Sequence, residues 1–215
     1  MIRKILLVCG VLSSLLYVAM IVFVPMQFEG YSSASQTVSE LSAIGAPTRT
    51  LWVSLGKVYT LLAVAFGWGV WKSAGRNRPL RIAGGLLIAY VVIGLAWPPM
   101  HQREALAAGE KTLTDTMHIV FTMVTLLLML LAIGFAATAF GKRFRLYSIG
   151  TILIFVVFGA LTGLDASRLE ANLPTPWMGV WERINIYAYM LWVVVLSILL
   201  LRGRGAQPRD GLGGR

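Results

Sequence analysis

The sequence predicts an all-α polytopic membrane protein, a bundle of six transmembrane helices with both termini in the cytoplasm. Three observations predict this class. Apolar residues make up 57% of the chain and charged residues only 13%, which is far from the usual soluble composition. Six apolar stretches approach the length of about 20 residues that crosses a hydrocarbon core. The polar segments between these stretches alternate in charge.

The spans occupy most of a single domain at residues 1–201 and leave no room for a separate soluble domain. The first span follows Arg3 and Lys4, exceeds the length of a cleavable signal sequence, and has no small-residue cleavage site after it. The tail at 202–215 is rich in Gly and Arg and is expected to be disordered. The expected spans are about 5–25, 51–71, 82–98, 117–140, 146–164 and 183–201.

Charge alternation predicts the orientation of the spans. One set of segments is almost purely basic: Arg3, Lys4, Lys72, Arg76, Arg78, Arg81, Lys142, Arg143, Arg145, Arg202, Arg204, Arg209 and Arg215. The other set carries every acidic residue except Asp210: Glu29, Glu40, Glu104, Glu110, Asp115, Asp165, Glu170 and Glu182. Short loops rich in Lys and Arg stay in the cytoplasm. The sequence therefore predicts a multi-pass plasma-membrane protein whose acidic loops face outward.

The net charge of +10 does not indicate nucleic-acid binding, because the positive charge is divided among short segments beside spans. Contact with anionic membrane lipids accounts for it better. Membrane lipids are thus the expected partners, and no protein partner is indicated. Because Cys9 is the only cysteine, an intrachain disulfide is excluded, and we interpret Cys9 as a packing residue.

The loop after the first span has a helical pattern. Thr37 and Glu40 match a capping box, and Val38, Leu41 and Ile44 recur every three residues. Gly45 and Pro47 then stop a helix. We expect a short amphipathic helix that lies on the outer membrane surface or folds over the mouth of the bundle.

Polar residues at the outer ends of the spans suggest a pocket. Lys57 lies inside the second span, where a charge usually faces the bundle interior with a partner such as Glu40, Asp165 or Glu182. Alternatively, Lys57 snorkels outward and the other charges pair at the rim without a further role. The candidate pocket comprises Ser39, Glu40, Lys57, Asp165, Arg168, Glu182, Arg183 and Asn185.

A divalent metal such as zinc is a second hypothesis, and no other cofactor is evident. Asp115 and His118 share a helix face, and His101 just upstream could be a third ligand. The alternative is structural: Thr114 or Thr112 caps the helix, Asp115 complements the helix dipole in the first turn, and His118 forms a hydrogen bond within the bundle. The histidines lack the HxxxH and HExxH spacings. Glycines in the third and fifth spans, including Gly84 and Gly150, predict that these two spans form the packing centre.

A set of motifs extends over residues 5–201: the segment 36–41, Gly45-Ala46-Pro47, Pro98, His118, Glu182-Arg183 and Trp192. In these residues the chain resembles the DUF998 family of bacterial and archaeal membrane proteins. The resemblance implies a six-span bundle without an established activity. In that family an acid often follows the proline that closes the third span, whereas here His101 follows Pro98-Pro99-Met100.

Three functional classes stay open, and whether the protein is an enzyme is undecided. The first is a module that binds or senses a lipid or another envelope component through an outward-facing polar pocket. The second is a membrane-embedded hydrolase, metal-dependent or not, that acts on a lipid from the outer side. The third is a small transporter. This class has the weakest support, because no span is clearly broken and the internal repeat is faint.

Overall fold

A computed structural model shows an all-helical bundle and describes residues 1–171 and 173–203. The expected disordered tail falls almost wholly outside these residues. The described part contains no strand and has one isolated parallel bridge, between Ile44 and His101. The helices are α1 Ile2–Phe23, η1 Val24–Gln27, η2 Val38–Ser42, α2 Arg49–Ser73, α3 Arg78–Gly94, α4 Arg103–Ala107, α5 Leu113–Ala139, α6 Lys142–Glu170 and α7 Met178–Leu201.

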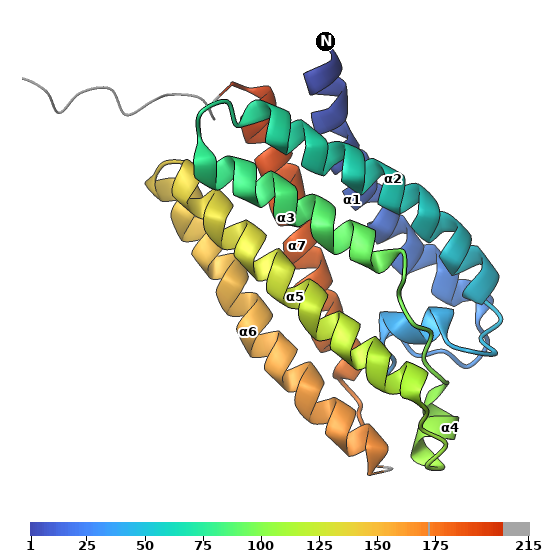
Figure 1. Cartoon of the computed structure of the whole chain (residues 1–215). Coiled ribbons are helices and arrows are strands. Elements are labelled where there is room, and N and C mark those ends of the chain that lie inside the picture. The colour runs from blue at the N-terminus through green and yellow to red at the C-terminus, as the bar shows by residue number, and fades with distance from the viewer. Residues whose placement is uncertain (172, 204–215) are drawn as a thin grey trace, which may run out of the picture.

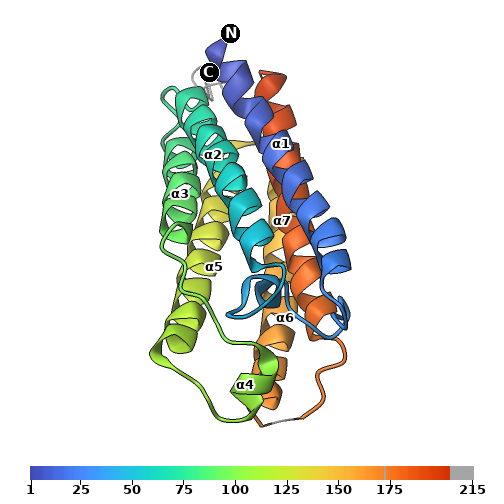
Figure 2. The same cartoon turned by 90° about the vertical axis from the view of Figure 1, so that its right-hand side faces the viewer.

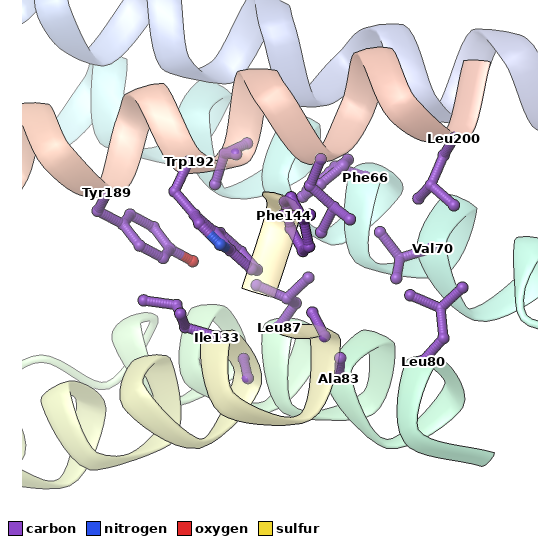
Figure 3. Close-up of a cluster of buried hydrophobic side chains, with 14 of the residues drawn as sticks. Phe66, Val70, Leu80, Ala83, Leu87, Ile133, Phe144, Tyr189, Trp192 and Leu200 are labelled. Atoms are coloured by element: carbon purple, nitrogen blue, oxygen red, sulfur yellow. The ribbon is translucent and has the colours of Figure 1, made fainter. Parts of the chain in front are cut away.

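The six longer helices form a closed ring in chain order. Each packs against the next, from α1 through α2, α3, α5 and α6 to α7, and α7 packs back against α1 (Figures 1 and 2). Neighbours are antiparallel because short turns join α2 to α3 and α5 to α6. Aromatic and aliphatic side chains fill the interior, with Trp192 and Leu87 near its centre (Figure 3).

Within the described part of the chain, five helices are long and apolar enough to cross a membrane: α1 with η1, α2, α5, α6 and α7. Helix α3 is also apolar but has only 17 residues and ends at Gly94, before the expected boundary at Pro98. The residues that follow contain the short helix α4, which the sequence pattern did not predict.

The two ends of the bundle differ in charge, as the sequence pattern predicts. The N-terminus, the α2–α3 turn and the α5–α6 turn lie at one end, which we call the basic end (Figure 1). Helices η2 and α4 lie at the opposite, acidic end, with Glu40, Asp115 and Glu182. The antiparallel ring brings acidic segments that are distant in sequence to one end.

The prediction that glycines allow close helix packing is confirmed for α3 but not for α6. A Cβ at Gly84 of α3 would lie 2.7 Å from the backbone nitrogen of Trp71, so only glycine allows α2 and α3 to approach this closely. Gly150 and Gly163 of α6 have no neighbour within 4 Å of such a Cβ. The prediction that α6 belongs to the packing centre is wrong, because these two glycines meet no neighbour and Gly159 approaches only the side chain of Asn185, at 3.8 Å.

Candidate site at the acidic end

The connection between η1 and α2, here called the long loop (residues 28–48), packs into the acidic end of the ring. The Thr37–Glu40 capping box begins η2, and Gly45 adopts a φ of +83°, which glycine tolerates. Val38 and Leu41 are at most 2% exposed and pack against Ile21 of α1. Of the two expected placements, the structure has the helix folded over the bundle mouth, as a 3-10 helix.

Glu40 is the central acceptor of the long loop. Its Oε2 lies 2.7 Å from Nε of Arg103, and Nη2 of Arg103 donates to its Oε1 at 2.8 Å. Thr37 and Gln36 also donate to the carboxylate. The carboxylate is 2% exposed, yet these donors satisfy it fully. The hydrogen bond to Glu40 raises the pKa of Arg103, which stays protonated.

Arg183 and Glu182 attach the same loop to α7. Arg183 donates to the carbonyls of Ser33, Gln36 and Gly179 at 2.8–3.0 Å and to the hydroxyl of Tyr31 at 2.7 Å. Glu182 accepts a hydrogen bond from the backbone N–H of Val38. Burial raises the pKa of Tyr31 to about 12, so its hydroxyl is neutral at physiological pH.

Gly179 lets the long loop approach α7. A Cβ at this position would lie 2.3 Å from the carbonyl oxygen of Gln36 and 2.6 Å from that of Ser33. Both carbonyls accept from Arg183, one helical turn further on. Gly179 and Arg183 therefore form one receptor for the backbone of the long loop.

Asp115 organises a second group at the acidic end. It accepts hydrogen bonds from the backbone N–H and the hydroxyl of Thr112, the N-cap of α5. Thr112 is one of the two caps that the structural alternative named. Asp115 also accepts from the backbone N–H of His101 at 2.7 Å and lies 2.9 Å from Nδ1 of the same residue. The carboxylate thus fixes the imidazole so that Nδ1–H donates and Nε2 is left as the acceptor.

His118 makes different contacts from the other two predicted metal ligands. Its Nδ1 lies 2.8 Å from the carbonyl oxygen of Pro98. The indole N–H of Trp97 donates to the same imidazole, with Nε1 at 2.9 Å from Nδ1 and 3.4 Å from Nε2, and the two rings meet edge-on. In residues 1–171 and 173–203, no three His, Cys, Asp or Glu side chains are grouped closely enough to hold a metal ion. The metal site stays a prediction, and the structure joins only His101 to Asp115.

The remaining predicted pocket residues lie apart from the long loop. Lys57 is exposed on α2 and forms no ion pair with another described residue, in line with the snorkelling alternative. Asp165 pairs weakly with Arg168, at 3.9 Å, on the end of α6. Asn185 turns to α6, where its amide group can donate to Ile154 and accept from Gly159. Ser39 is partly buried beside Glu40.

Arg103 is the residue that sequence reasoning missed. It lies 63 residues from Glu40, so no local pattern joins them. The available signal was chemical: a buried carboxylate needs a cation from its own side of the bundle, and Arg103 is one of few.

The comparison with protein families agrees with this architecture. Residues 11–199 match the family described as "Protein of unknown function (DUF998)". The chain belongs to this family. The match extends from α1 to α7 and so includes the entire ring and both groups at the acidic end. No curated protein and no solved structure matches the chain.

Proposed function

We propose that this DUF998 protein is a six-span module of the plasma membrane that binds or senses an anionic lipid or envelope component at its acidic end. In this proposal the long loop is a lid. The observation that carries it is the two-sided attachment of a buried loop, to Arg103 on one side and to Arg183 on the other.

The orientation follows from charge. The basic end would face the cytoplasm by the positive-inside rule, which places the lid on the outer side. Helix α3 would be the sixth span, since 17 residues rise about 25 Å, a little less than a hydrocarbon core of roughly 30 Å. The ring then has an even number of crossings.

Arg103 supplies the specificity in this proposal. Its guanidinium holds Glu40 in a two-point contact, and the same fork fits a phosphate group. The side chain is 19% exposed, whereas Glu40 is almost fully buried. An anionic headgroup would therefore reach Arg103 from outside, displace Glu40 and release the lid.

The experiment measures the position of the lid in defined lipids. Nitroxide labels at Ser33 and Ser167, both exposed, are introduced into a Cys9→Ser background and the protein is placed in nanodiscs. We expect the distance distribution to differ between phosphatidylglycerol and phosphatidylcholine. Arg103→Gln should abolish this difference, and Arg168→Gln should keep it. Identical distributions in both lipids for the parent protein would refute the proposal.

A hydrolase is the second candidate, favoured by the His101–Asp115 contact. The contact presents Nε2 of His101 as a base or as a metal ligand at a side chain that is 25% exposed. The test is the zinc content of protein purified without chelators. Zinc at one equivalent that is lost in His101→Ala and Asp115→Asn supports this candidate; a folded protein that takes up no added zinc rejects its metal-dependent form.

A further inference from the structure

Three tyrosines from different helices meet inside the ring. The hydroxyl oxygens of Tyr59 on α2 and Tyr90 on α3 lie 2.8 Å apart. Tyr189 on α7 meets the ring of Tyr90 edge-on, with centroids 5.8 Å apart, and is only 1% exposed. Figure 3 shows its hydroxyl pointing away from α7 into the interior, toward the helices that carry Ile133 and Leu87.

Only one hydrogen bond joins the three hydroxyls. The bond between Tyr59 and Tyr90 uses one hydroxyl proton, whichever residue donates. The hydroxyl of Tyr189 has no hydrogen-bond partner among the described residues. A chain from Tyr189 through Tyr90 to Tyr59 would use two of the three protons, and the third would still need an acceptor unless the chain closed into a ring.

An unpaired hydroxyl is costly at this depth. All three tyrosines lie in the apolar interior of helices that are proposed to cross the membrane, where no bulk solvent can supply an acceptor. Buried polar groups in proteins are normally hydrogen-bonded, to protein or to an ordered molecule. The arrangement therefore calls for an oxygen that accepts from Tyr189.

We infer that Tyr59, Tyr90 and Tyr189 form a buried binding site for one oxygen acceptor. The acceptor is either an internal water molecule or an oxygen of a bound lipid; both present lone pairs to the hydroxyls. This site is separate from the lid contacts, and it rests on the proposed function only in that its helices cross the membrane.

The site has a route to the acidic end. The ring of Tyr17 lies 4.8 Å from that of Tyr59 and packs against the cluster of Ile21, Val38 and Leu41. Tyr17 thus stands between the buried site and the underside of the long loop. Displacement of Leu41 would bring the site closer to the outer solution.

The test asks whether Tyr189→Phe lowers the melting temperature or leaves it unchanged or higher. If an acceptor is bound, Tyr189→Phe removes a satisfied hydrogen bond and should lower the melting temperature in nanodiscs by about 2–4 °C. If the hydroxyl is unsatisfied, the same variant should melt at the same temperature or higher. Tyr187→Phe, exposed on the same helix, is the matched control and should melt like the parent protein.

An experimental structure that resolves water provides the second readout. We expect density about 2.6–3.2 Å from Oη of Tyr189. Mass spectrometry of the intact protein then separates the two sources, since only a bound lipid adds mass. An unchanged or higher melting temperature for Tyr189→Phe, or the lack of any such density, would overturn the inference.

Discussion

Glu40 and Arg103 form a two-point contact between two loops that lie 63 residues apart, with nitrogen–oxygen distances of 2.7 and 2.8 Å. One partner is nearly inaccessible and the other is partly exposed. The contact joins the long loop to the connection between α3 and α5. The two connections are therefore held together over the acidic end of the ring.

A double-mutant cycle measures the strength of this contact. Glu40→Gln should lower the free energy of unfolding by about 1–3 kcal/mol, because the guanidinium of Arg103 loses its carboxylate partner. Arg103→Gln should cost a similar or larger amount, because it leaves the buried carboxylate of Glu40 without its cation. The double variant should cost less than the sum, with a coupling of about 0.5–3 kcal/mol. Additive losses in thermal or denaturant unfolding would show that the two residues do not interact.

Gly179→Ala tests the close approach of the long loop to α7. The added methyl group meets a backbone carbonyl, which cannot rotate away, so we expect a loss of about 1–3 kcal/mol and faster proteolysis within residues 28–48. Gly163→Ala is the control, because its methyl group meets nothing within 4 Å. Equal proteolysis rates for the two variants would argue against this packing.

Asn185→Leu tests how α6 is held. The amide of Asn185 bonds to the backbone of α6 near Gly159, and such interhelical bonds in membranes are worth about 0.6 kcal/mol, at most about 1.7. We expect faster hydrogen exchange in α6 around Gly159, and no change in the control Tyr187→Leu on the exposed face of α7. Unchanged exchange in Asn185→Leu would mean that the apolar contacts alone position α6.

Labelling from either side tests the proposed sixth span. In a Cys9→Ser background, Arg76→Cys lies in the turn before α3 and Glu110→Cys in the connection after it, and both positions are exposed. If α3 crosses the membrane, a thiol reagent that cannot cross should label Glu110→Cys in intact cells and Arg76→Cys only after lysis. Labelling of both in intact cells would exclude a spanning α3.

Local features of the fold and the site could be predicted from sequence. The capping box at Thr37–Glu40 joins residues three apart through hydrogen bonds between side chains and the backbone of one turn, and Thr112 is a cap of the same local kind. The charge partition follows from the alternation of loops in an antiparallel bundle. Each of these signals lies within one segment or repeats between segments.

Pairings across the ring could not be predicted. Several cations at the same end could pair with Glu40. The depth of Lys57 within the second span favours it as the partner, but the sequence does not show to which side of α2 its side chain points. The structure turns Lys57 outward and supplies Arg103 instead. For the same reason Asp165 and Arg168, on the end of α6, lie away from the lid contacts although they are at the same end of the bundle.

Hydrogen exchange of the long loop tests the central claim, that charge contacts hold it closed, most directly. The backbone amides of residues 38–41 are measured in nanodiscs for the parent protein, Arg103→Gln and the control Arg168→Gln. We predict strong protection in the parent and in Arg168→Gln, and exchange at least tenfold faster in Arg103→Gln, equivalent to about 1.4 kcal/mol of lost closure. Unchanged protection in Arg103→Gln would contradict the account.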